Sequence, residues 1–189
     1  MKAFLAIDFG AKKAGTTAIA WLEDGALQLA QSVKNQDADR WLRQQIKQLQ
    51  PEALYIDAPL SLPLAYRQAT DTPDFHYRAC DRAVGAMSPL FLGGLTARAM
   101  QLVHEMGLKA YEVYPKLAGH AIAKDHYHKK NGATLTDFTK VLHAHLPYPA
   151  PPPANWHQAD ALLAWHIGWR HQQGEADGVG TAAEGVIWY

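Results

Sequence analysis

The sequence predicts an α/β protein with a mixed sheet of five or slightly more strands and helices on both faces. Two observations lead to this fold class. Short apolar runs typical of buried strands recur along the chain, and segments long enough for crossover helices separate several of them. The chain has 189 residues, which suits one domain, so we expect residues 1–189 to form a single unit with one core.

Three strands are predicted near the N-terminus, at residues 2–8, 16–22 and 26–33. The first is a continuous apolar run, and the second is rich in Thr, Ile and Trp. Asp24-Gly25 is a hairpin-turn signal between the second and the third. These segments therefore predict a three-stranded meander.

Helices and strands alternate in the rest of the chain. Helices are predicted over residues 37–49, 74–86, 96–106, 136–145 and 156–171. Buried strands are predicted at 53–57 and 109–114, with a last edge strand at 185–189. Five of the eleven prolines lie in residues 147–155, which predicts an extended connector to the final helix. Residues 174–180 are expected to form a flexible loop.

The composition excludes several classes of protein. The 18 basic and 18 acidic residues give a net charge of zero, so no general field attracts nucleic acid or an acidic membrane. Any polyanion must be held by local contacts. The single cysteine, Cys80, excludes a disulfide framework and a zinc site made of several thiolates. No stretch suits a signal peptide or a bilayer span, and we expect a cytoplasmic protein without membrane contact.

Carboxylates follow two of the predicted buried strands. Asp8 and Asp57 each come directly after a run that ends in Ile. Functional groups in open α/β sheets gather beyond the carboxyl ends of the strands, so neighbouring strands would bring both groups to one crevice. An all-oxygen site of this kind suits Mg²⁺ or Mn²⁺. The alternative is that each Asp caps the turn after its strand.

Two further acids are candidates for the same site. Asp160 shares a face of its predicted helix with Trp156 and Leu163, so it should point toward the sheet, where an isolated carboxylate is costly. A metal shared with the other acids would remove this cost, and a hydrogen bond to a buried donor would lower it. Glu112 lies on a predicted strand, where an ion pair at the sheet edge explains it almost as well.

Three basic residues are candidates for binding a substrate phosphate. Lys12 lies in the turn after Asp8, and Arg78 and Arg82 lie four residues apart on one predicted helix face. Two such guanidinium groups can hold a phosphate through paired hydrogen bonds. The alternative is an ordinary solvated surface, with Asp81 paired to Arg78.

Six motifs resemble one protein family nearly end to end: IDFGAKKAGTT, IDAPLSLP, YRACDRAVGAMSP, EVYP, HQADALLAWHIGWR and EGVIWY. The chain resembles domain-of-unknown-function family 429, described as nucleases of the ribonuclease H-like fold in the superfamily of Holliday-junction resolvases. The resemblance implies a nuclease that hydrolyses phosphodiester bonds of DNA or RNA with a carboxylate-bound Mg²⁺ or Mn²⁺. It implies that Asp8, Asp57 and Asp160 bind the metal. Glu112 is the candidate for a fourth catalytic acid, but the usual glutamate of the superfamily arises elsewhere, so the sequence departs here from the full four-carboxylate pattern and leaves open whether one metal or two are bound.

Two other functions stay open. The stretch after the first strand also resembles the phosphate-binding hairpin of the actin and hexokinase superfamily, which would make the chain an ATP-binding phosphotransferase. Those enzymes hold ATP between two domains, whereas 189 residues suit one. A non-catalytic module that binds nucleic acid or protein would have no need for three crowded carboxylates. The sequence leaves the oligomeric state open, a homodimer included.

Overall fold

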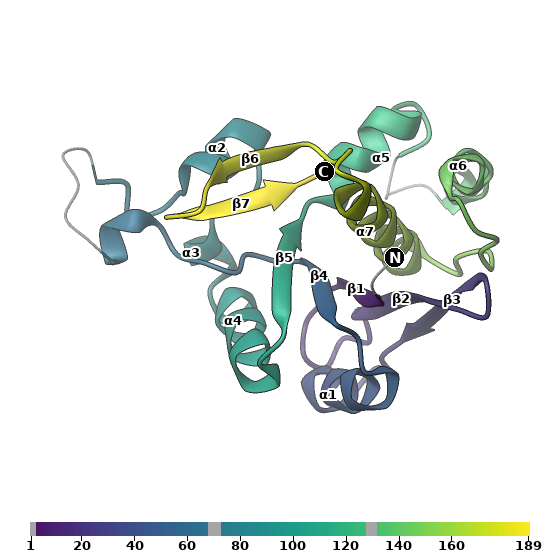
Figure 1. The fold of residues 1–189 in the computed structure, drawn as a ribbon, viewed down its shortest axis with the longest axis horizontal. Helices are drawn as coiled ribbons and strands as arrows, with labels where there is room; N and C mark the ends of the chain where they lie inside the picture. Colours follow the sequence, from purple (N-terminus) through teal and green to yellow (C-terminus); the bar gives the residue numbers. More distant parts are fainter. Residues whose placement is uncertain (1–2, 68–72, 128–131) are drawn as a thin grey trace.

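The computed structural model describes residues 3–67, 73–127 and 132–189. Within these ranges seven strands form one sheet in the order β3-β2-β1-β4-β5-β7-β6 (Figure 1). The strands are β1 (Phe4–Asp8), β2 (Ala18–Glu23), β3 (Ala26–Gln31), β4 (Ala53–Asp57), β5 (Lys109–Val113), β6 (Gly178–Thr181) and β7 (Gly185–Trp188).

The sheet is mixed, as predicted. Strands β1, β2 and β3 form the antiparallel meander, and the turn between β2 and β3 uses positive φ angles at Asp24 and Gly25. Strands β1, β4, β5 and β7 pair parallel to one another in that order. The hairpin partner β6 runs antiparallel to β7 and forms the edge. The carboxyl ends of β1 and β4 therefore lie side by side in the centre of the sheet.

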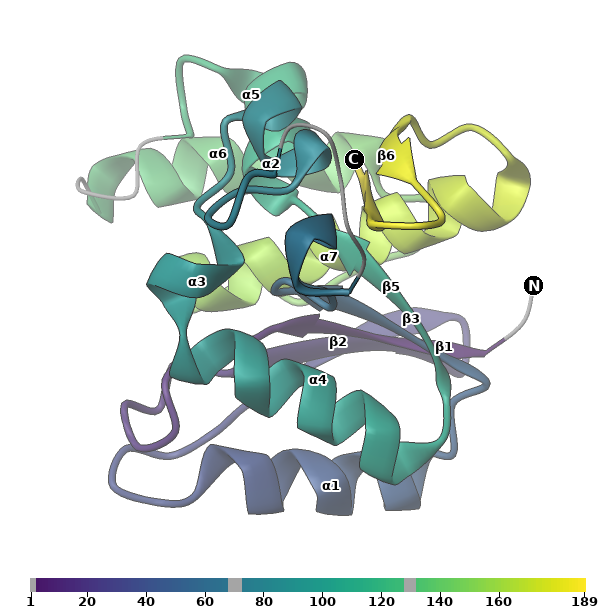
Figure 2. The same ribbon diagram turned by 90° about the vertical axis from the view of Figure 1, so that its left-hand side faces the viewer.

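Helices cover both faces, which confirms the predicted layers (Figures 1 and 2). They are α1 (Ala38–Leu49), α2 (Ala79–Val84), α3 (Pro89–Leu92), α4 (Gly94–Met106), α5 (Pro115–Ala123), α6 (Gly132–His145) and α7 (Trp156–Gln173), with a 3₁₀ turn at Leu64–Tyr66. Helices α5, α6 and α7 share one core with the sheet, and α1 and α4 share the other.

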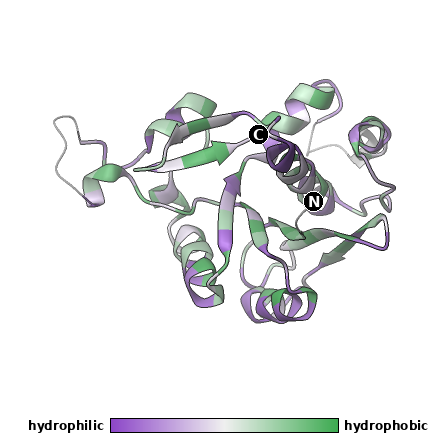
Figure 3. Cartoon of the chain, viewed as in Figure 1, coloured by the Kyte–Doolittle hydropathy of each residue, from purple (hydrophilic) through white to green (hydrophobic). Residues whose placement is uncertain are grey.

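The alternation of side chains along β1 assigns each residue to one of these cores. Phe4 and Ala6 pack with α7, whereas Leu5 and Ile7 pack with α1 and α4. On the solvent side α1 is polar, so hydrophobic and hydrophilic residues alternate along it (Figure 3). The central helix α7 lies very close to the sheet, because a Cβ added at Gly168 would lie 2.8 Å from the Phe4 ring.

Three predicted elements differ from the structure. The helix predicted at 74–86 shortens to α2, because Asp74 accepts hydrogen bonds from the backbone N–H groups of His76 and Tyr77 and holds a turn there. Pro115 starts α5 instead of only ending the strand before it, since proline is well accepted in the first turn of a helix. The loop predicted at 174–180 contains the start of β6. Strand β7, which was predicted as the edge strand at 185–189, therefore lies between β5 and β6.

No helix in the described part of the chain combines the length and the apolar character that crossing a bilayer requires.

His166 on α7 makes the fold sensitive to acid. Its side chain is buried, and burial, followed by the nearby charges of Arg170 and His145, lowers its pKa to about 4. The unfolded chain therefore takes up this proton first as the pH falls, and the folded state loses stability between about pH 6.5 and pH 4. Between about pH 6.5 and pH 4 this proton costs the wild type about 3 kcal/mol of its free energy of unfolding, and we expect His166→Leu to abolish that loss in urea titrations. The same change at exposed His104 should leave the slope unaltered, and equal slopes in both variants would refute the assignment.

Candidate metal centre

Strands β1 and β4 bring two carboxylates together. The strands pair in parallel with Asp8 opposite Asp57, so both residues end their strands at the same edge of the sheet. In each strand, the residue two positions before the aspartate packs with α7. Alternate residues of a strand point to the same face, so both aspartates point to the α7 face. Asp8 is largely buried, with 8% of its surface exposed. The sequence pattern and the sheet register thus agree on where these two groups meet.

Helix α7 supplies the third carboxylate. Asn155 caps the helix by accepting hydrogen bonds from the backbone N–H groups of His157 and Gln158, at 3.0 and 3.2 Å. The helix then runs across β1 and β2 and buries Asp160 against them. One oxygen each of Asp8, Asp57 and Asp160 lies within 4.8 Å of the other two. The predicted convergence of the three carboxylates is confirmed, and their role in binding a metal stays a prediction.

Two side chains hold the carboxylates in place. His157 Nδ1 donates to Asp8 Oδ2 at 2.8 Å, because an ionised carboxylate can only accept. Tyr127 donates its hydroxyl to Asp160 Oδ1 at 2.8 Å. Burial raises the pKa of Tyr127, and the negative charges of Asp160, Asp57 and Asp8 raise it further. The tyrosine therefore stays protonated and remains a donor to Asp160.

The ring of Tyr127 is closely packed by its neighbours. The ring is 5% exposed and lies against Phe138 and Trp156, with centroids 5.2 and 5.4 Å apart. A Cβ added at Gly119 would lie 2.6 Å from the ring, so only glycine leaves room for it on α5. Sequence reasoning missed Tyr127, since it lies outside every motif and every predicted element. His157, in contrast, is within the reach of sequence reasoning, because it lies on the predicted helix of Asp160, where it is expected as a structural histidine or a proton carrier at the site.

The three carboxylates suit a hard divalent cation. They offer oxygen atoms only, which is the donor set that Mg²⁺ and Mn²⁺ prefer. Three carboxylates this close repel one another, and a divalent ion between them would offset that repulsion. The chemistry of the site therefore fits the predicted metal.

Glu112 does not join this group. In the sheet it lies opposite Ile56, one residue before Asp57, so its side chain projects to the other face. There it binds Arg78 through two hydrogen bonds of 2.6 and 2.7 Å and accepts the backbone N–H of Leu60 at 3.0 Å. The structure thus places Glu112 in the framework behind the carboxylates.

Arg78 is the centre of that framework. It is fully buried and also binds both carboxylate oxygens of Asp81, at 2.6 and 3.0 Å, and the Ser61 hydroxyl at 2.8 Å. Burial alone would lower the pKa of Arg78, but the hydrogen bonds with Glu112 and Asp81 outweigh burial and raise it. Every guanidinium nitrogen is hydrogen-bonded to a protein group, which leaves Arg78 poorly suited to clamp a phosphate.

The other two basic candidates lie on the surface in ion pairs. Lys12 Nζ is 3.2 Å from Asp37 Oδ2, at the start of α1. Arg82 donates through Nε to Asp74 at 2.8 Å and lies over the Tyr77 ring, 4.4 Å from its centroid. Arg78 and Arg82 do not share a phosphate-binding face, because one is buried and the other exposed.

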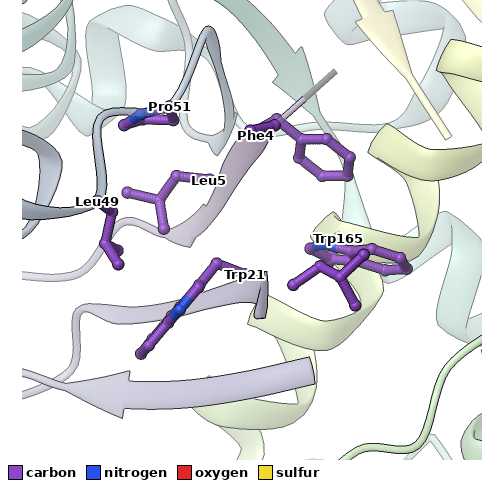
Figure 4. A pocket seen from close by; sticks show the side chains of 8 residues that line it. Phe4, Leu5, Trp21, Leu49, Pro51 and Trp165 are labelled. Atoms are coloured by element: carbon purple, nitrogen blue, oxygen red, sulfur yellow. The ribbon is translucent and has the colours of Figure 1, made fainter. Parts of the chain in front are cut away.

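An apolar pocket lies at the other end of β1. It has a volume of about 180 Å³ and is lined in part by Phe4, Leu5, Trp21 and Trp165 (Figure 4). Phe4 starts β1 and Asp8 ends it, so this pocket is separated from the carboxylates by the length of the strand. It is therefore not part of the candidate metal centre.

Comparisons with known proteins agree with this architecture. No family model and no curated protein matches the sequence, so the resemblance to family 429 remains an interpretation of the motifs. Among solved structures, T. thermophilus RuvC in complex with a Holliday junction substrate is similar, with a TM-score of 0.51 and 14% identity over 93% of this chain and 98% of that chain. A second Thermus thermophilus RuvC structure has a TM-score of 0.46 and 15% identity over 92% and 97% of the two chains. The chain has a ribonuclease H-like fold, like the first of these structures.

Proposed function

We propose that this protein is a divalent-metal-dependent nuclease that uses Mg²⁺ or Mn²⁺. The observation that carries the proposal is the meeting of Asp8, Asp57 and Asp160, which come from two strands and a distant helix to within 4.8 Å of one another. A ribonuclease H-like fold similar to that of a protein bound to a Holliday junction adds support. A turn-capping role explains each Asp alone, but it does not explain why all three converge.

Each residue of the site has a definite task in this proposal. Asp8, Asp57 and Asp160 would hold the ion, which when bound lowers the pKa of the attacking water and stabilises charge on the leaving oxygen. Tyr127 and His157 orient two of the carboxylates through their hydrogen bonds. Glu112 and Arg78 stabilise the strand ends from the opposite face.

The substrate in this proposal is DNA or RNA. With a net charge of zero, the protein needs local contacts to hold a phosphate backbone. Exposed Lys12 and Arg82 are the remaining candidates for such contacts. Both are in surface ion pairs, which are weak because solvent screens them, and each can be exchanged for a contact with a phosphate.

The proposal is tested with the purified chain and a panel of single strands, duplexes, flaps and four-way junctions of DNA and RNA. We expect cleavage of at least one substrate with Mn²⁺ or Mg²⁺ and none with EDTA. ATP binding measured by calorimetry provides the contrast. Tight ATP binding without cleavage would favour the phosphotransferase alternative, and nucleic-acid binding without cleavage would favour a binding module; either result contradicts the nuclease.

A further inference from the structure

An arginine lies under the turn that follows Asp8, on the face of the sheet away from the carboxylates. Arg98 comes from α4, and its Nη1 donates to the carbonyl oxygen of Gly10 at 3.2 Å. Its guanidinium group lies over the Phe9 ring, 4.9 Å from the centroid. Phe9 and Gly10 are the two residues directly after Asp8, so Arg98 contacts the backbone where the chain leaves the metal centre.

A buried carboxylate fixes the orientation of this guanidinium group. Asp39, in the first turn of α1, is 7% exposed and accepts from Arg98 Nε at 2.9 Å and from Nη2 at 2.5 Å. Two parallel hydrogen bonds hold the plane of a guanidinium in a way that a lysine ammonium cannot. Helices α1 and α4 therefore jointly aim Nη1 at Gly10.

The other groups of Gly10 are held as well. Its N–H donates to Thr17 Oγ1 at 3.1 Å, and a Cβ added at this position would lie 2.2 Å from Thr16 Oγ1. Gly10 is thus fixed through its N–H by Thr17, the residue directly before β2, and through its carbonyl by Arg98. With the backbone held on both sides, Asp8 has little freedom to turn away from Asp57 and Asp160.

The loop after Asp57 is held in a parallel way. Arg78 binds Ser61 directly, and through Glu112 it holds the backbone N–H of Leu60. Each of the two neighbouring carboxylates is therefore followed by backbone that an arginine–carboxylate pair fixes in position. An ordinary packing role would not require the pairs to coincide with both strand ends.

We propose that Arg98 is a positioning residue for the metal centre: it acts through the Gly10 backbone to hold Asp8 in the geometry that binds the ion. This inference rests on the proposed function, since it assigns Arg98 to the same site. Replacing a residue that orients a metal ligand without binding the metal itself typically weakens metal binding by about 10- to 100-fold. The expected signature is a loss of affinity larger than any general loss of stability explains.

The test compares Arg98→Met and Arg98→Lys with Arg43→Met. Arg43 on α1 pairs with Glu105 on α4 at 2.7 Å, so the control also breaks a link between these two helices but touches no residue near Asp8. Mn²⁺ affinity is measured by calorimetry at a temperature where all variants are folded, and thermal unfolding is followed in metal-free buffer. We expect about 10- to 100-fold weaker Mn²⁺ binding in both Arg98 variants and unchanged binding in the control.

Several results would overturn the inference. Wild-type affinity in Arg98→Met would remove the positioning role while leaving the nuclease proposal intact, and full affinity in Arg98→Lys would show that the paired geometry is not needed. Equal weakening in Arg43→Met would mean that the α1–α4 contact acts only through general stability. If the wild-type chain binds no Mn²⁺, the metal centre and this inference fail together. The lysine variant keeps the charge, so it gives a folded protein if the methionine variant does not.

Discussion

Asp8→Asn is expected to reduce metal-dependent cleavage by about three orders of magnitude or more. The change removes one negative oxygen donor from a site where the ion must stabilise several kcal/mol of transition-state charge, and each 1.4 kcal/mol corresponds to about a factor of ten in rate. The side chain keeps its size and still lies next to His157, so the surrounding contacts change little. The measurement is single-turnover cleavage with saturating Mn²⁺.

The same variant should be at least as stable as the wild type without metal. Removing one of three carboxylates that lie within 4.8 Å of one another relieves their mutual repulsion. Thermal unfolding in EDTA should therefore give an equal or higher Tm, and added Mn²⁺ should raise the Tm of the wild type more than that of the variant.

Asp24→Asn is the matched control for this experiment. Asp24 is an exposed acid in the turn between β2 and β3, at the end of the sheet opposite Asp8. The Asp24→Asn variant loses one negative charge, as Asp8→Asn does, and should cleave as fast as the wild type. Undiminished cleavage in Asp8→Asn, or an equal loss in Asp24→Asn, would end the assignment of the carboxylate centre.

Arg78→Met should cost about 3–5 kcal/mol of the free energy of unfolding. Removing one partner of a buried ionic network leaves the others uncompensated, and here both Asp81 and Glu112 lose their cation. A domain of this kind is stable by only about 5–15 kcal/mol, so the variant loses a large part of its stability. Urea unfolding monitored by tryptophan fluorescence measures the loss.

The exposed arginine of the same segment is the control. Arg82→Met breaks a surface pair with Asp74, which is screened by solvent, so it should cost far less than Arg78→Met. The double variant Arg78→Met with Glu112→Gln should recover part of the loss, because it removes one of the two unpaired charges. Similar costs for the two arginines would show that the buried network contributes little.

The loss of unfolding free energy in Arg78→Met should also depend on pH. Burial raises the pKa of Glu112, and Arg78 opposes that rise. Without Arg78 the folded state takes up this proton at a higher pH than the unfolded chain does, so lowering the pH favours the folded state. The stability gap to the wild type should therefore narrow as the pH falls, and a gap that widens on acidification would contradict this account.

The sequence predicted much of the candidate metal centre because its elements have strong local signals. The strands before Asp8 and Asp57 are continuous apolar runs that stop at a carboxylate, and the parallel pairing of β1 and β4 makes those ends meet. Asp160 could be placed from the apolar face of its helix, and the cap at Asn155 is visible in the sequence. These three positions follow from local periodicity and a general rule of sheet topology.

Other parts of the site depend on information that a single sequence does not hold. Alternation along β5 shows which residues share a face with Glu112, but the register with β4 decides which face that is, and a shift of one residue reverses it. Tyr127 reaches Asp160 only through the packing of α5 and α6, which no local pattern specifies. The burial of Arg78 was missed for the same reason, since its partner Glu112 comes from a distant strand.

The placement of β7 has a consequence for protein synthesis. This strand pairs with β5, and Glu184, just before it, accepts the backbone N–H groups of Leu64 and Ala79 near the loop after Asp57. Ribosomes add residues from the N-terminus onward, so the central sheet and that loop lack these partners until residues 178–188 have emerged from the exit tunnel. A growing polypeptide therefore cannot complete the hydrogen bonds that hold this loop until its last strand has been synthesised.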